Sequence, residues 1–127
     1  MMNIEHVTSG PGIPKSPLPF SAAVKAGGFI FVSGQASTDE NGKIISEDFE
    51  AEFRRTIGHL SAILKAAGAT LKDVVQVKSY VKDHADLPLY NKLYREYFSE
   101  PFPARTTITD CLGVVKYEID VIAYVGK

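Results

Sequence analysis

The chain has 127 residues, of which 45% are hydrophobic and 23% are charged, and its formal net charge is −1. These values predict one globular domain over residues 1–127, and they exclude the clustered basic surface that nucleic-acid binding usually needs. The single cysteine, Cys111, excludes an intrachain disulfide and is typical of a reducing compartment. Because we find neither a signal-peptide pattern nor a long apolar run, we expect a cytoplasmic protein that does not span a membrane.

The first third of the chain predicts an extended loop followed by a hairpin. Four prolines between residues 11 and 19 indicate a non-helical segment on the surface. Strands are predicted over residues 21–26 and 29–33, joined by Gly27-Gly28, a pair typical of a hairpin turn. Asn41-Gly42 predicts a second tight turn.

The clearest element is a helix of about five turns that is predicted to begin after Ser46 as its cap. Glu47 and Asp48 would occupy the first turn, where the helix dipole favours negative charge. Gly68 is expected to end the helix. Apolar residues recur at helical spacing and predict one face packed on a sheet, at Phe49, Phe53, Ile57, Leu60, Leu64 and Ala67.

A strand and a second helix are predicted next. Residues 74–82 alternate, which predicts a strand covered on the face that carries Val75, Val77, Ser79 and Val81. Asp86 is expected to cap the helix, with Pro88 in its first turn and prolines after it. The buried stripe of this helix is predicted at Leu89, Leu93 and Tyr97, widened by Tyr90 and Tyr94.

Two final strands, over residues 104–110 and 116–125, complete the order β-β-α-β-α-β-β. This order predicts an α+β sandwich with two helices on one face of a mixed sheet. The last strand has one apolar face, from Tyr117 to Val125, but its other face also carries Ile122 and Tyr124. Since two helices cannot cover both faces, the second face predicts sheet-to-sheet burial in an oligomer.

The last two strands also carry the residues that indicate chemistry. Arg105 shares a strand face with Thr107, and a guanidinium beside a hydroxyl is suited to hold a small carboxylate. Glu118 could handle a proton or a water molecule. The alternative is a structural ion pair between Arg105 and Glu118. The histidines show no metal-ligand spacing, so no metal site is expected from His6, His59 and His84.

Several short segments together resemble the RidA family, also called the YjgF family, from about Phe20 to Tyr124. The first half contributes Ala23-Val24-Lys25-Ala26-Gly27, Phe31-Val32-Ser33-Gly34-Gln35 and Asp73-Val74-Val75. The second half contributes Asn91-Lys92-Leu93-Tyr94, Tyr97-Phe98, Phe102-Pro103-Ala104-Arg105 and Glu118-Ile119.

The resemblance implies a chorismate-mutase-like α+β fold that assembles as a homotrimer around a central barrel, with ligand clefts between subunits. It also implies hydrolysis of reactive enamine or imine acids, such as 2-aminoacrylate and 2-iminopropionate, to a 2-keto acid and ammonia. It implies no metal and no organic cofactor.

The resemblance assigns roles to individual residues. Arg105 would clamp the substrate carboxylate and Glu118 would orient or activate the attacking water. The pocket would be lined by Ser33, Gly34 and Asn91. Two positions depart from the usual family pattern, since Phe20 stands where a tyrosine is usual and Thr107 where a cysteine is usual.

Three other functions remain open from the sequence. The first is hydrolysis of a different imine acid, such as an aminomuconate-type substrate. The second is a ribonuclease or translation-inhibitor role, a label that some relatives carry and that the near-zero net charge disfavours. The third is a non-catalytic trimer that binds small acids through the same arginine.

Overall fold

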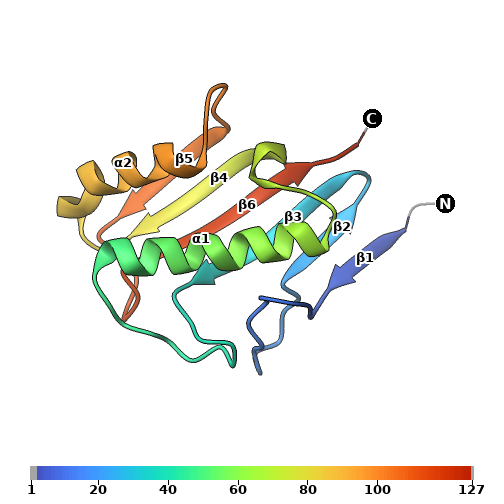
Figure 1. Cartoon of the computed structure of the whole chain (residues 1–127), viewed down its shortest axis with the longest axis horizontal. Coiled ribbons are helices and arrows are strands. Elements are labelled where there is room, and N and C mark those ends of the chain that lie inside the picture. Colours follow the sequence, from blue (N-terminus) through green and yellow to red (C-terminus); the bar gives the residue numbers. More distant parts are fainter. Residues whose placement is uncertain (1–2, 127) are drawn as a thin grey trace.

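The computed structural model describes residues 3–126, which form one six-stranded sheet and two α-helices (Figure 1). The sheet order is β1-β2-β3-β6-β4-β5, and only β4 and β5 pair in parallel. The elements are β1 (Ile4–Val7), β2 (Ala23–Ala26), β3 (Phe29–Ala36), α1 (Phe49–Ala66), η1 (Leu71–Asp73), β4 (Val74–Val81), η2 (His84–Asp86), α2 (Leu87–Tyr97), β5 (Ala104–Thr109) and β6 (Tyr117–Tyr124).

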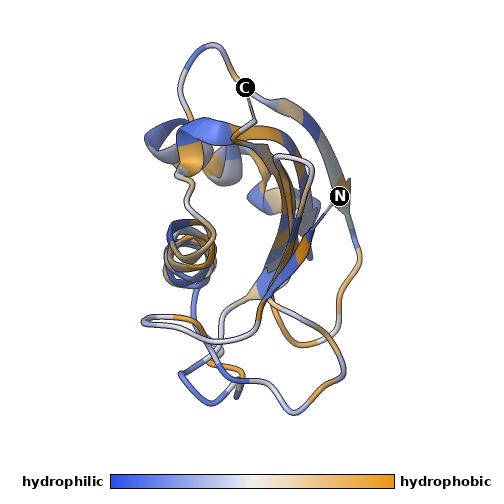
Figure 2. Ribbon diagram, turned by 90° about the vertical axis from the view of Figure 1, so that its right-hand side faces the viewer, coloured by the Kyte–Doolittle hydropathy of each residue, from blue (hydrophilic) through white to orange (hydrophobic). Residues whose placement is uncertain are grey.

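Both helices lie on the same side of the sheet, and the other side is open (Figure 2). This confirms the prediction of an α+β fold with two helices on one face of a mixed sheet. The open face carries large apolar side chains that remain substantially exposed, among them Phe29, Phe31, Ile108 and Tyr124. Phe31 lies opposite Ile122, and Phe29 lies opposite Tyr124.

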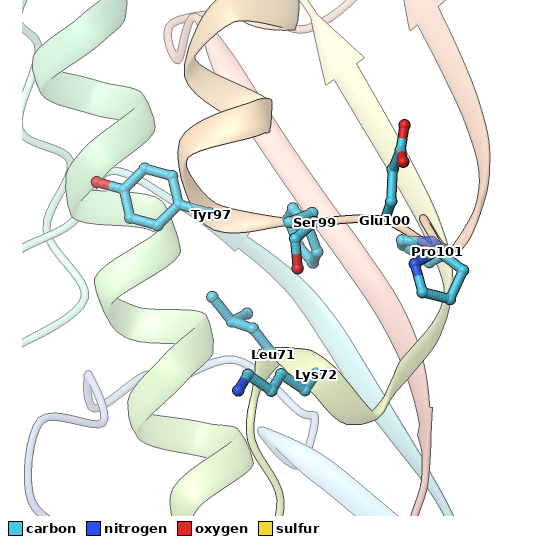
Figure 3. Close-up of a pocket in the computed structure, with 8 residues that line it drawn as sticks. Leu71, Lys72, Tyr97, Ser99, Glu100 and Pro101 are labelled. Atoms are coloured by element: carbon cyan, nitrogen blue, oxygen red, sulfur yellow. The ribbon is translucent and has the colours of Figure 1, made fainter.

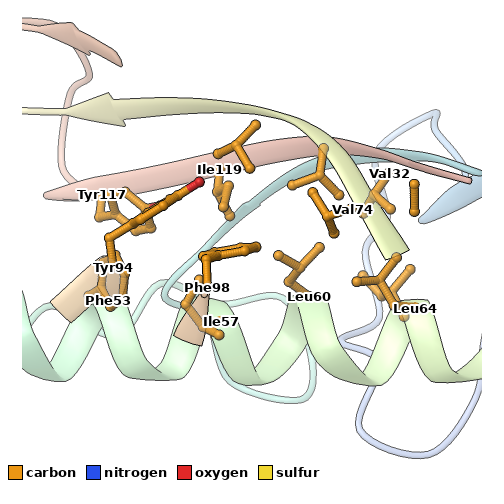
Figure 4. Close-up of a cluster of buried hydrophobic side chains, with 14 of the residues drawn as sticks. Val32, Phe53, Ile57, Leu60, Leu64, Val74, Tyr94, Phe98, Tyr117 and Ile119 are labelled. Carbon is orange, nitrogen blue, oxygen red and sulfur yellow. The ribbon is translucent and has the colours of Figure 1, made fainter. Parts of the chain in front are cut away.

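The core lies between α1 and the covered face of the sheet (Figure 4). The predicted stripe of α1 is buried from Phe49 to Ala67. On β6, the side chains of Tyr117, Ile119, Val121 and Ala123 are buried against it, as the alternation predicts. Phe53 makes the central aromatic contact, with its ring 4.6 Å from that of Tyr117.

The predicted helix caps need correction. The cap of α1 is Asp48, because its carboxylate accepts a hydrogen bond from the Ala51 N–H at 2.8 Å, whereas Ser46 lies two residues too early. Asp86 does precede α2, but its side chain makes no capping bond. Asp83 caps the preceding turn instead, by accepting from the Ala85 N–H at 2.9 Å.

Three strands differ from what the sequence predicts. β1 was not predicted, because four residues with two polar members give too weak a pattern. β3 continues to Ala36 through a register shift between Val32 and Gln35. In β4 a register shift between Val74 and Gln76 exposes Val75 and buries Val74, so only the later part of the predicted face is correct.

The buried face of α2 is rotated from the predicted one. Tyr90, Leu93 and Tyr94 are buried, whereas Leu89 and Tyr97 are only half-buried. The rings of Tyr90 and Phe53 lie 6.2 Å apart and edge to face, so the larger aromatic surfaces turn towards the core. Within residues 3–126, neither helix is long and apolar enough to cross a membrane.

Glu52 is a fully buried carboxylate on α1 that fastens two distant loops to the helix. It accepts hydrogen bonds from the backbone N–H groups of Glu47 at 3.0 Å and Lys116 at 2.9 Å. The Lys116 ammonium also lies 3.3 Å from its oxygen. Because Lys116 directly precedes β6, this carboxylate fixes the start of the strand that carries Glu118.

We expect Glu52→Ala to lower the free energy of unfolding by about 3 kcal/mol, because it leaves two backbone donors without an acceptor. Chemical denaturation monitored by circular dichroism measures the change. Glu50→Ala is the matched control on the same helix, since Glu50 is exposed and its ion pair with Arg54 is solvated and therefore weak. Equal effects of the two substitutions would contradict the anchoring role of Glu52.

Candidate active site

Arg105 lies on the edge strand β5 with its guanidinium over two tyrosine rings of α2. The guanidinium carbon is 5.0 Å from the centroid of the Tyr90 ring and 4.7 Å from that of Tyr94. Its register partner on β4, Val77, is buried, so Arg105 is on the covered face of the sheet. Among residues 3–126, no ion pair involves Arg105. Its hydrogen-bonding fork is therefore available to an anion from outside the chain.

Two further predicted residues lie beside Arg105. The Thr107 hydroxyl is 3.1 Å from the Tyr90 hydroxyl, which ties β5 to α2. Asn91 and Arg105 both line a small pocket, about 210 Å³ in volume, between α2 and the start of β5. We call this the arginine pocket, and its lining residues are Asn91, Tyr94, Arg95, Phe102, Pro103 and Arg105.

Glu118 lies on β6 and faces the opposite side of the sheet. Its register partners are Tyr80 on β4 and Ala36 on β3. Since β4 separates β5 from β6, Arg105 and Glu118 are on non-adjacent strands as well as on different faces. The alternative of an ion pair between these two side chains within the chain is therefore wrong.

Of the remaining predicted residues, Gly34 lies against Glu118, whereas Ser33 and Phe20 make other contacts. A Cβ atom added at Gly34 would lie 2.7 Å from a carboxylate oxygen of Glu118, so a larger residue at this position would displace the carboxylate. Ser33 donates its hydroxyl to the Ser21 carbonyl at 2.6 Å. Phe20 is exposed and lines, together with Gly34, a pocket of about 230 Å³ beneath the proline-rich loop. We call the two residues in close approach, Gly34 and Glu118, the carboxylate patch.

The electrostatic surroundings of Glu118 favour its protonated form. Burial raises the pKa of Glu118 above its ordinary value, and the neighbouring carboxylate of Asp120 raises it further. Asp120 accepts a hydrogen bond from the Tyr80 hydroxyl at 2.9 Å, and this bond raises the pKa of Tyr80. A raised pKa makes the Glu118 carboxylate a stronger base than an ordinary glutamate, which suits it to accept a proton.

A cluster of possible metal ligands and a second pocket contain none of the predicted site residues. Asp83, His84 and Asp110 offer ligand atoms within 4.8 Å of one another, but all three are exposed. The hydrogen bond between the His84 ring and the Asp110 carboxylate raises the pKa of His84 and lowers that of Asp110.

A pocket of about 350 Å³ lies between η1 and the segment after α2 (Figure 3). It is lined by Leu71, Lys72, Tyr97, Phe98, Ser99, Glu100, Pro101 and Pro103.

Comparison with known proteins places the chain in a family. The model of the family described as endoribonuclease L-PSP matches residues 13–125. The chain belongs to this family. It is 43% identical over 114 residues to a RutC family protein of Pyrococcus abyssi, covering 87% of this chain and 90% of the relative. It is 30% identical over 108 residues to the 2-iminobutanoate/2-iminopropanoate deaminase of Dermatophagoides farinae, covering 84% of each.

A solved structure of a protein named RidA has the same fold. The crystal structure of RidA from the Antarctic bacterium Psychrobacter sp. superimposes with a TM-score of 0.86 at 29% identity, covering 95% of this chain and all of that chain. The resemblance to the RidA family and the α+β architecture are thereby confirmed. The homotrimer, its barrel and the roles of the individual residues stay predictions.

Sequence patterns did not reveal the tyrosine support of Arg105 or the neighbours of Glu118. Tyr90 and Tyr94 were assigned to the apolar stripe of a helix, although their four-residue spacing does place both rings on one side. Asp120 follows Glu118 at the two-residue period of a strand, which is a usable signal. Tyr80 was not identifiable, because its proximity to Asp120 depends on strand pairing.

We expect Glu118→Gln to make the protein more stable than the parent at pH 8, because it replaces a half-buried charge with a neutral side chain of similar shape. Since the folded-state pKa is raised, the parent gains stability as the pH falls through that pKa towards the ordinary value of 4.5. The advantage of the variant should therefore shrink towards pH 5. Thermal unfolding from pH 5 to 8 measures it.

Glu40→Gln is the control for this comparison, since Glu40 is an exposed carboxylate in a loop. It should change the melting temperature little across the same pH range. A Glu118→Gln variant that is less stable than the parent at pH 8 would contradict the assigned environment of Glu118.

Proposed function

We propose that this protein hydrolyses reactive enamine or imine acids of the 2-aminoacrylate/2-iminopropionate class to a 2-keto acid and ammonia. The observation that carries the proposal is Arg105, an arginine without an acidic partner in the described chain, whose fork is open to a small carboxylate. The relative from Dermatophagoides farinae, named as a 2-iminobutanoate/2-iminopropanoate deaminase, supports the reaction class.

In the proposed mechanism, Arg105 binds the substrate carboxylate through two parallel hydrogen bonds and so fixes the position of the imine carbon. Glu118 accepts a proton from a water molecule as its oxygen attacks that carbon, and then returns a proton to the nitrogen. The hydroxyl group of the resulting carbinolamine then gives up its proton to the nitrogen as the C–N bond breaks and the C=O bond forms, so that one imine and one water give one 2-keto acid and one ammonia. No nucleophilic side chain is needed, which is consistent with Thr107 in place of a cysteine.

This mechanism requires a second copy of the chain, because the arginine pocket and the carboxylate patch lie on opposite faces of the sheet. We propose a homotrimer in which the open sheet faces pack around a central barrel and each cleft combines the two groups from neighbouring subunits. The exposed apolar side chains of the open face, Phe29 and Phe31 among them, support this assembly.

We expect the protein in solution to have about three times the 13.9 kDa mass of one chain. Size-exclusion chromatography with light scattering at micromolar concentration measures this mass. Phe31→Glu, which places a charge in the middle of the open face, should shift the protein towards the monomer and abolish activity. A monomeric parent would remove the basis for a shared site.

We expect Arg105→Lys to reduce imine hydrolysis roughly 10- to 100-fold, because lysine keeps the charge but loses the planar fork and one charge-assisted hydrogen bond. The substrate is 2-iminopropionate, generated from alanine by an amino-acid oxidase, and semicarbazide traps whatever imine remains. Turnover is the decrease in trapped imine upon addition of the protein.

Arg54→Lys is the control, because Arg54 also lies over a tyrosine ring of α2, at 5.8 Å from Tyr97, but forms ion pairs with Glu50 and Glu96. It should keep parental turnover. Parental turnover in Arg105→Lys, at unchanged stability, would contradict the role of Arg105 as the carboxylate clamp. No turnover in the parent would contradict the proposed reaction.

A further inference from the structure

The guanidinium of Arg105 rests on two buried rings that are one turn apart on α2. Tyr90 is 0% exposed and Tyr94 is 3% exposed, and the two ring centroids are 5.8 Å apart. Cations within about 6 Å of an aromatic ring are attracted by its negative face, and Arg105 satisfies this condition for both rings. The rings therefore contact Arg105 from the side of α2 and the core.

The two rings are themselves held firmly. The Tyr94 ring stacks on Phe98, with centroids 4.5 Å apart and an interplanar angle of 23°. The Tyr90 ring lies 5.8 Å from that of Tyr117, and Tyr117 in turn bonds Ser79 at 2.9 Å. Tyr94, Phe98 and Tyr117 all belong to the packed layer between α1 and the sheet (Figure 4). Side chains in such a layer have few alternative rotamers.

Tyr90 and Tyr94 support Arg105 differently, because only the Tyr90 hydroxyl has a hydrogen-bond partner among the described residues. The Tyr90 hydroxyl bonds Thr107 at 3.1 Å, two residues beyond Arg105 on the same strand face. Tyr90 thus holds both the side chain of Arg105 and the strand that carries it. The Tyr94 hydroxyl is buried without a hydrogen-bond partner among the described residues, so the contact of Tyr94 with Arg105 is made by its ring alone.

We infer that Tyr90 and Tyr94 are positioning residues that hold the Arg105 guanidinium with its fork turned towards the arginine pocket. The inference rests on the proposed function, and it names the residues that determine how tightly the carboxylate of the substrate is bound. Without the rings, a flexible side chain on an exposed edge strand samples several rotamers, and carboxylate binding must first select one of them.

This role predicts a specific kinetic signature. The rings determine how often the guanidinium is oriented to bind, so their loss weakens carboxylate binding and raises KM, whereas a substrate already bound through both hydrogen bonds reacts at close to the parental kcat. Tyr94→Met fills the space with an adaptable apolar side chain and removes the ring. We expect it to raise KM for 2-iminopropionate about 10-fold and to weaken binding of pyruvate, the product, by a similar factor.

Two further variants separate positioning from simple packing. Tyr94→Phe keeps the ring and removes the unpaired hydroxyl, so it should restore most of the affinity that Tyr94→Met loses. Tyr97→Met removes the ring beneath Arg54, a similar contact on the same helix away from the arginine pocket, and should leave KM unchanged. Tyr90→Phe keeps both rings but frees Thr107, and should raise KM about 3-fold.

The experiment measures kcat and KM by the trapping assay and pyruvate affinity by titration calorimetry, with circular dichroism as the folding check. A folded Tyr94→Met with parental KM and parental pyruvate affinity overturns the inference while the proposed function stands. If Tyr94→Met does not fold, a parental KM in Tyr90→Phe overturns it instead. A parent that neither hydrolyses the imine nor binds pyruvate overturns both the inference and the proposed function.

Discussion

Coverage of only one face of the six-stranded sheet is the constraint on which the rest of this structure depends. Two helices bury Val77 and Ile119 on one side, whereas Phe31 and Tyr124 remain exposed on the other. Because side chains on a strand alternate, the same division separates Arg105 from Glu118. An uncovered apolar face and a divided set of polar residues thus have one origin, and the proposed association of copies through the open face would resolve both.

The arginine of the candidate site is held by aromatic rings and not by a carboxylate. An acidic partner would occupy the same donors that a substrate carboxylate needs, whereas a ring contacts the face of the guanidinium and leaves its edge donors free. Arg54 provides the contrast within the same protein, since it lies over Tyr97 but also forms ion pairs with Glu50 and Glu96. Arg54 is therefore a structural cation and Arg105 an available one.

The proposed reaction also agrees with what the surroundings of Glu118 provide. Glu118 has a raised pKa, lies beside Gly34 and belongs to a strand whose start is fixed by Glu52, and these properties suit the proton transfer that the proposed reaction needs. Membership of the L-PSP family does not by itself select this reaction, since the family model is described as an endoribonuclease. The net charge of −1 gives little attraction for a polyanion, whereas an arginine with open donors, such as Arg105, suits a small acid.

The sequence by itself determined the fold class and the two helices, because these depend on periodicity and on local chemistry, and it singled out Arg105 and Glu118, whose roles stay predictions. The stripe of α1 and the alternation of β6 were confirmed for this reason. The cap at Asp48, the exposure of Val75 and the rotation of α2 were not predictable, because they depend on backbone geometry and on packing between distant segments. Only the tertiary structure decided that Arg105 lies over Tyr90 and Tyr94 and that Glu118 faces the other way. Strand order and strand pairing fix these relations, and both arise from contacts between residues far apart in the sequence.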